Sequence, residues 1–143
     1  MPALSGQQEE FLVLQMILLR EGLRDVPAMN GMLTAFNDRD LIDIAAYYTA
    51  AKPFTSGGPR DTQRYAAGTA LSQAMGCDSC HMAGYIGQHQ VPRITNQRED
   101  YLTSTLKAYR DNKRSGTDTS MNGVMYQTTD ADIAALAHYL SHQ

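Results

Sequence analysis

The residues with the clearest chemistry are Cys77 and Cys80, which are separated by two residues and followed at once by His81. Two thiols at this spacing lie on one side of a helical turn, and the adjacent imidazole can ligate a metal. The pattern is typical of covalent c-type haem attachment, in which both thiols add to the porphyrin vinyl groups and the histidine binds iron. The motif therefore predicts a haem held by these three residues.

Two other interpretations of the motif fit less well. A thioredoxin-like dithiol needs a βαβ setting, and no strand pattern flanks this segment. A zinc site needs about four ligands. The chain has only these two cysteines, and the other histidines (His89, His138 and His142) show no paired metal spacing. Because no cysteine is left over, haem attachment remains the prediction.

Length and composition set the outer bounds of the fold. With 143 residues, 43% of them hydrophobic, the chain can form one domain or two small ones with a core. The net charge of −3 indicates no nucleic-acid partner. Residues 91–114 hold six of the twelve Lys and Arg residues, which indicates either a solvated helix face or a docking patch for an acidic redox partner.

The chain also contains an internal repeat. Residues 29–47 match residues 121–139 at a constant offset of 92, with nine similar positions in nineteen. Upstream, residues 2–24 match residues 92–114 at an offset of 90. Residues 1–50 therefore repeat residues 91–142, but only the second copy is preceded by a helix pattern and the cysteine motif.

Apolar periodicity and capping residues predict five main helices, at residues 9–24, 38–51, 61–75, 97–112 and 129–141. Residues 25–37, 82–96 and 114–126 are expected to be loops, and the proline- and glycine-rich residues 52–59 to be a linker. The apolar run 11–19 follows two glutamates, so it does not resemble a signal peptide, and it is too short to span a bilayer. We expect its apolar surface to be covered by self-association or by a partner subunit.

The motif, Pro92, Asn96-Gln97, Met121 and the closing helix together resemble class I cytochromes c, and the duplication resembles the two-domain dihaem cytochromes of the cytochrome c4 kind. The resemblance implies an all-α fold. Residues 1–52 would form a partial cytochrome c repeat without a haem-attachment motif, and residues 53–60 a linker. Residues 61–143 would form a complete domain of three to four core helices around one haem c. The family has two attachment motifs, so truncation, a misplaced start and loss of one haem all remain open.

The same resemblance implies roles for individual residues. Met121 is the expected axial ligand opposite His81, and it recurs in the first copy as Met29. Met125, four residues further on, is the alternative ligand. The carbonyl of Pro92 is the expected acceptor for the second ring N–H of His81.

Four further residues have expected roles. The resemblance implies that Gly68, in the helix before the motif, lets the terminal helix cross closely, and a tolerated helix glycine is the alternative. Tyr101 or Arg98 could contact a haem propionate, although a plain core or surface role remains the alternative. Met29 has no attached haem in its own copy and is expected to pack as a loop methionine.

Iron held by His81 and Met121 has no open position, so the resemblance implies a single-electron carrier rather than an enzyme. Two alternatives remain: a cytochrome subunit of a larger dehydrogenase or oxidase complex, and a peroxidase-like or ligand-binding haem protein. Expected partners are a redox donor and acceptor, with peripheral contact to a membrane-bound oxidase as a further option. Attachment of c-type haem implies a periplasmic location, although this chain shows no signal peptide.

Overall fold

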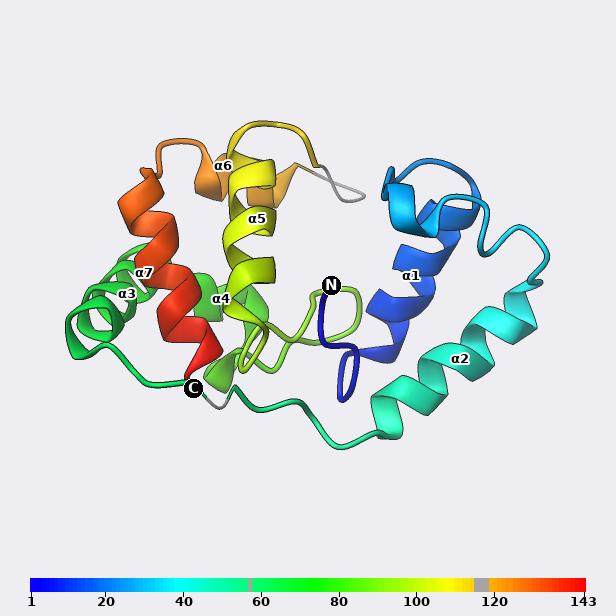
Figure 1. The fold of residues 1–143 in the computed structure, drawn as a ribbon, viewed down its shortest axis with the longest axis horizontal. Helices are drawn as coiled ribbons and strands as arrows, with labels where there is room; N and C mark the ends of the chain where they lie inside the picture. Colours follow the sequence, from blue (N-terminus) through cyan, green and yellow to red (C-terminus); the bar gives the residue numbers. More distant parts are fainter. Residues whose placement is uncertain (57, 115–118) are drawn as a thin grey trace.

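The computed structural model describes residues 1–56, 58–114 and 119–143, and in this part of the chain every regular element is a helix. Two helical halves lie side by side, with the N-terminal segment running between them (Figure 1). The α-helices are α1 (Glu9–Arg20), α2 (Asp38–Ala50), α3 (Thr62–Ala74), α4 (Cys77–His81), α5 (Glu99–Arg110), α6 (Ser120–Met125) and α7 (Asp130–Ser141). Short 3-10 turns span Pro27–Met29 (η1) and Ala83–Tyr85 (η2). The predicted all-α class is confirmed.

The repeat is also present in the structure. Helices α1 and α5 begin and end at positions 90 apart, and α2 and α7 begin 92 apart. Both α2 and α7 start with a capping box, in which the side chains of Asn37 and Thr129 each accept a hydrogen bond from the backbone N–H three residues on. The two copies thus share local structure as well as sequence, because equivalent residues satisfy the same free helix-end groups.

Two predicted boundaries differ from the structure. Helix α1 ends at Arg20 rather than Arg24, because the chain turns at Gly22 (φ +70°) and the N–H groups of Leu23 and Arg24 both bond to the Leu18 carbonyl. The predicted loop 114–126 contains α6, which is too short for an apolar period to reveal. Residues 115–118 of that loop and residue 57 of the linker lie outside the described part.

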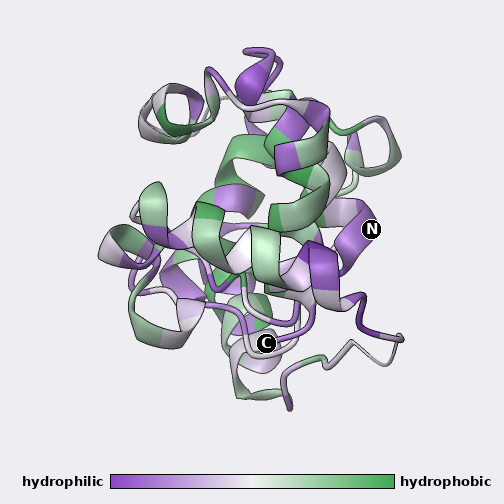
Figure 2. Cartoon of the chain, turned by 90° about the vertical axis from the view of Figure 1, so that its left-hand side faces the viewer, coloured by the Kyte–Doolittle hydropathy of each residue, from purple (hydrophilic) through white to green (hydrophobic). Residues whose placement is uncertain are grey.

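The core of the second half lies where α3 and α5 pack against α7. One cluster surrounds Tyr85, Leu102 and Leu140, and a second surrounds Leu106, Met125 and Ile133. Hydrophobic and hydrophilic residues alternate around the helices in Figure 2, as expected when one face of each helix is buried. Helix α7 is buried along most of its length and is the centre of this half.

The crossing of α3 and α7 depends on Gly68, as predicted. A Cβ atom at this position would lie 2.5 Å from the Tyr139 Cβ and closer still to the backbone carbonyl oxygen of Ala135. Real Cβ atoms do not approach so closely, so any side chain at residue 68 would push the two helices apart.

Replacing Gly68 with alanine should therefore destabilise the protein by about 1–3 kcal/mol, the usual cost of overpacking a core. The matched control is Gly123→Ala in α6, where no atom lies within 4 Å of the added Cβ. That variant should be neutral or slightly stabilising, since alanine favours helix over glycine. Urea unfolding of both variants checks this prediction, and equal stability of the two would contradict it.

The first half lacks a counterpart of α3 within residues 1–56. Its helices α1 and α2 pack on each other around Leu12 and Leu41. Tyr47, the repeat partner of Tyr139, is 73% exposed, whereas Tyr139 is buried. A groove of about 350 Å³ runs along α1 past Val13 and Ile17. The expected self-association through residues 11–19 stays a prediction.

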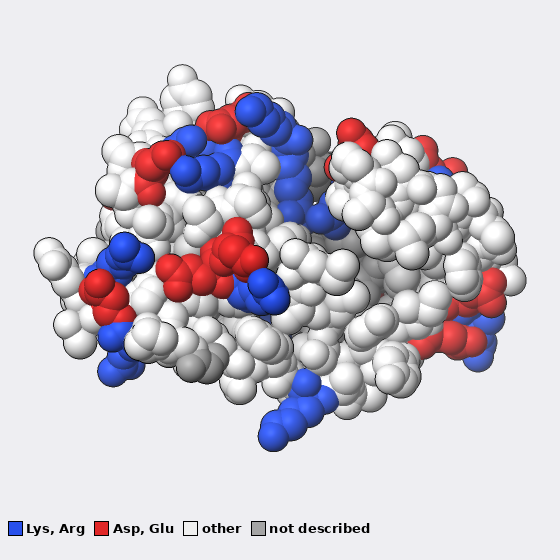
Figure 3. Space-filling model, in the orientation of Figure 1, with Lys and Arg blue, Asp and Glu red and all other residues white. Residues whose placement is uncertain are grey.

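Charged side chains of both signs are spread over the surface (Figure 3). No helix in the described ranges has the length and apolar character needed to cross a membrane.

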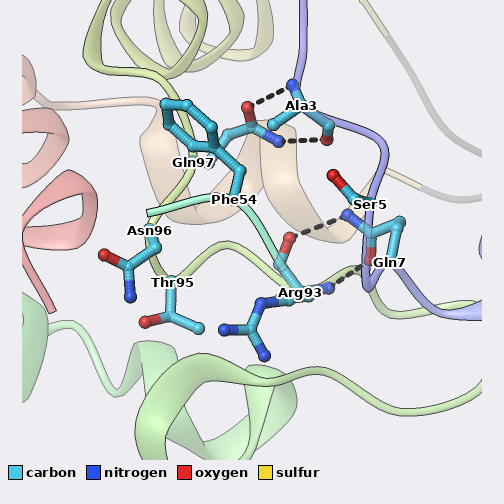
Figure 4. Close-up of a pocket in the computed structure, with 8 residues that line it drawn as sticks. All are labelled: Ala3, Ser5, Gln7, Phe54, Arg93, Thr95, Asn96 and Gln97. Carbon is cyan, nitrogen blue, oxygen red and sulfur yellow. Dashed lines mark hydrogen bonds between the residues drawn. The ribbon is translucent and has the colours of Figure 1, made fainter. Parts of the chain in front are cut away.

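Two buried glutamines join the halves (Figure 4). The Gln97 side chain accepts from the N–H of Ala3 at 2.7 Å and donates to the Ala3 carbonyl at 2.9 Å. Gln7 makes the same pair of bonds to the backbone of Arg93, at 2.6 and 2.9 Å. Because Gln7 corresponds to Gln97 and Ala3 to Arg93 in the repeat, the contacts are reciprocal, as at a twofold interface.

Replacing Gln97 with alanine should destabilise the protein by about 1–3 kcal/mol, because it leaves the backbone groups of Ala3 without partners at a partly buried site. The exposed Gln63→Ala in α3 serves as the control. Thermal unfolding measures both, and an effect of Gln97→Ala no larger than that of Gln63→Ala would show that the reciprocal bonds do not hold the halves together.

Candidate haem site

The cysteine motif forms its own short helix, α4, which starts after Gly76 in the left-handed conformation (φ +64°). Cys77 is partly buried and Cys80 is exposed, and both are free thiols. Burial raises the pKa of the Cys77 thiol, and a hydrogen bond with Ser72 acts in the opposite direction. The helical turn thus offers two thiols in different environments, next to the histidine that ends it.

His81 is buried, and its Nδ1 lies 2.8 Å from the carbonyl oxygen of Pro92. A carbonyl can only accept, so Nδ1 carries the proton and Nε2 keeps its lone pair. Burial lowers the pKa of His81, although the Pro92 carbonyl alone would raise it. The neutral ring with a free Nε2 is the form that binds iron.

The loop after the motif folds back so that Pro92 reaches the histidine. The Gly87 N–H bonds to the His81 carbonyl at 2.8 Å. Gly87 has a φ of +75°, and a Cβ there would lie 2.5 Å from the Pro92 carbonyl carbon and from the Arg93 nitrogen. Only glycine permits this approach, so Gly87 controls the position of the acceptor.

Met121 lies in the first turn of α6 and is partly buried against the cluster of Leu106 and Ile133. Met125 is 2% exposed and packs inside the cluster of Leu106 and Ile133. The two candidate ligands therefore differ in position: Met121 lies at the edge of the core and Met125 within it.

Asn122 fixes the start of α6. Its side-chain amide donates to the carbonyls of Tyr109 and Arg114 and to the Asn112 side chain, at 3.0, 2.7 and 3.2 Å. The sequence pattern did not predict this role, although Asn122 is one of the repeated residues, with Asn30 as its partner.

A second feature that the sequence did not predict is a chain of hydroxyl groups near Cys77. Ser72 donates to the Tyr85 hydroxyl at 2.9 Å, which lies 3.2 Å from the Tyr139 hydroxyl. All three side chains are buried. Helical and loop patterns place Ser72 and Tyr85 in separate elements, so only the tertiary structure brings them together.

The residues expected to contact a propionate have other partners. Arg98 forms an ion pair with Asp100 at 2.9 Å, and it holds the pKa of that carboxyl at about 2. The Tyr101 hydroxyl accepts from Arg114 at 3.2 Å. Contact of either residue with a propionate stays a prediction.

The prediction that the other histidines are not spaced to bind a metal was wrong for His138 and His142. With Glu99 they place one ligand atom each within 4.8 Å of one another. However, His138 accepts the Asp61 N–H through Nε2 and donates from Nδ1 to Glu99, at 2.9 and 3.0 Å. A metal on Nδ1 would move the proton to Nε2, against the Asp61 N–H, so the cluster acts as a hydrogen-bonded link between the N-cap of α3, α5 and α7.

The donor set fits a covalently bound haem: two free thiols on one helical turn, an imidazole with a free Nε2, and methionine sulfur in the α6 segment. Together with the all-helical fold, these features define a class I c-type cytochrome.

The chain belongs to the cytochrome c family, whose sequence model matches residues 65–143. It is similar to cytochrome c4 of Pseudomonas aeruginosa, with 33% identity over 97% of this chain and 74% of that protein. The crystal structure of reduced recombinant cytochrome c4 from Pseudomonas stutzeri matches with a TM-score of 0.87 and 31% identity, over 98% of this chain and 83% of that one.

Another relative is the thiosulfate dehydrogenase electron acceptor of Thiomonas intermedia, with 29% identity over 99% of this chain and 70% of that protein. Family membership implies a covalently bound haem c, and the chain is accordingly an electron-transfer haem protein.

Proposed function

We propose that the chain carries single electrons through one haem c, attached at Cys77 and Cys80, with His81 and Met121 as axial ligands. The observation that carries this proposal is the hydrogen bond from His81 Nδ1 to the Pro92 carbonyl, which leaves the Nε2 lone pair free to bind iron. When bound, the haem supplies a reversible one-electron couple. The chain is not an enzyme in this proposal, because two axial ligands leave no position for a substrate.

Each part of the site has a task in this role. Pro92 holds the imidazole in one tautomer, and Gly87 holds Pro92. Asn122 anchors α6 and therefore Met121. A rigid site needs little rearrangement between redox states, and a thioether ligand favours the reduced form and raises the potential. Met121 is preferred to Met125 because Met125 already fills the core.

Within this proposal, residues 1–52 are a partial cytochrome c repeat without its own attachment motif, residues 53–60 a linker, and residues 61–143 the domain that holds the one haem. The matching order of α1 and α2 with α5 and α7, at offsets of 90 and 92 residues, supports this division.

The partners would be a donor and an acceptor protein, and the location would be the periplasm, where c-type haem is attached. A second candidate is an electron-accepting subunit of a larger dehydrogenase. It is favoured by the likeness to the Thiomonas intermedia electron acceptor and to the thiosulfate dehydrogenase (TsdBA) of Marichromatium purpuratum, which matches at 27% identity and a TM-score of 0.84.

Intact-mass haem counting combined with oxidised and reduced absorption spectra tests the proposal. One covalent haem per chain, low-spin in both states and unreactive to carbon monoxide when reduced, is the expected result. Absence of covalent haem would overturn it. A high-spin spectrum with carbon monoxide binding would move the function to ligand binding or peroxidase-like chemistry. Co-purification with a second polypeptide would favour the subunit candidate.

A further inference from the structure

Two arginines that are equivalent in the repeat follow α1 and α5. Arg24 lies four residues after α1, and Arg114 lies four residues after α5. Both backbones make the same C-terminal turn: the Arg24 N–H bonds to the Leu18 carbonyl at 3.0 Å, and the Arg114 N–H to the Ala108 carbonyl at 3.1 Å. The repeat therefore places the two arginines in matching positions.

In the described part of the chain, the contacts of both arginines are polar or aromatic and involve no carboxylate. Arg114 donates to the hydroxyls of Tyr101 and Thr105, at 3.2 and 3.4 Å, and its guanidinium lies 5.0 Å above the Tyr109 ring. Arg24 donates to the Gln15 side chain at 2.6 Å. Among the residues that the structure describes, neither arginine has an acidic partner within 4.0 Å, whereas Arg20, Arg39, Arg64, Arg98 and Arg110 each do.

The two positive charges act on each other and on Tyr101. The pKa of Arg24 is lowered, first by burial and then by the charge of Arg114. Burial would raise the pKa of Tyr101, but Arg114 and Arg24 outweigh it and lower that pKa. Within the described ranges these two half-buried cations have no counter-charge, so they destabilise each other, and an anion between them would reverse this effect.

We propose that Arg24 and Arg114 form a binding site for a small oxyanion, a carboxylate or a phosphate-like group, at the junction of the two halves. Guanidinium groups present paired donors that match such groups. The Tyr101 hydroxyl, which accepts from Arg114, could donate its hydrogen to the same anion as a third contact. Lys and Arg side chains gather along the border between the halves in Figure 3, which would draw anions towards it.

The oxyanion has two possible sources, a propionate of the haem or a free anion from solution. The test uses purified holoprotein with Arg24→Gln, Arg114→Gln and the control Arg39→Gln, an exposed arginine of α2 paired only with Asp43. Each protein is titrated with inorganic phosphate at constant ionic strength by calorimetry. The reduction potential of each is then measured as a function of pH.

If the anion is free, the native protein binds phosphate, and Arg24→Gln and Arg114→Gln weaken binding at least tenfold while Arg39→Gln does not. If it is a propionate, phosphate does not bind, but the first two variants lower the potential and move its pH dependence to higher pH. The sign follows because loss of a nearby cation raises a carboxyl pKa and disfavours the reduced haem.

The proposal is overturned if both variants match Arg39→Gln in the two measurements, or if Arg24→Gln raises the thermal midpoint equally with and without phosphate. The second result would mean that no bound anion relieves the repulsion between Arg24 and Arg114. The phosphate measurement does not depend on His81 or Met121, so its failure is distinguishable from failure of the proposed electron-carrier role.

Discussion

Replacing Cys77 and Cys80 together with alanine should yield a chain that carries no covalent haem. The two thiols are the only cysteines in the sequence, and thioether formation needs one at each position. Intact mass under denaturing conditions should fall by the mass of one haem relative to the native protein. Each single variant should retain one thioether at reduced yield, with Cys77→Ala the more damaging to folding because Cys77 packs against the core.

The matched control is Ser79→Ala, between the two cysteines. It removes a hydrogen bond from the Ser79 hydroxyl to the Gly76 carbonyl at 2.6 Å but leaves both thiols in place. Its haem content should equal that of the native protein. Covalent haem in the double variant would show that the motif is not the attachment site.

The native reduced protein should not bind carbon monoxide, and replacing Met121 with alanine should make it do so. Loss of the thioether opens an axial position, and the potential should fall by on the order of 0.2 V, within the ~0.8 V range that axial ligands set. Absorption spectra with and without carbon monoxide, together with a redox titration, measure both effects.

Met125→Leu provides the comparison, because leucine has nearly the volume of methionine but cannot ligate iron. Met125 is fully buried, and a substitution that conserves its volume should cost less than about 1.5 kcal/mol of stability. If Met121 is the ligand, the variant should also keep the native spectrum. The opposite pattern, with a changed spectrum only in Met125→Leu, would make Met125 the ligand and overturn the assignment of Met121.

Some features of the protein follow from the sequence alone because they are local. The thiol spacing of Cys77 and Cys80 is a property of one helical turn. The five main helices follow from apolar period and caps, and the repeat predicted that α1 would match α5. Gly68 could be singled out because it stands where class I cytochromes have a small residue in this helix.

Other features depend on contacts that the apolar period of a single helix does not reveal. The sequence did not indicate the end of α1 at Arg20, because the Leu18 carbonyl accepts two N–H groups only once Gly22 has turned the chain. Nor did it indicate α6, which Asn122 holds through groups from three other positions.

The contacts between the halves were decided by tertiary structure alone. Helical period marks Gln7 and Gln97 only as polar residues near helix starts, and it cannot tell that each bonds to the backbone of the other copy. The same holds for Arg24 and Arg114, whose charges affect each other only because the halves face one another. Sequence determines which groups a helix presents, whereas the packing of the two halves decides which groups meet, because that packing depends on burial summed over the whole chain.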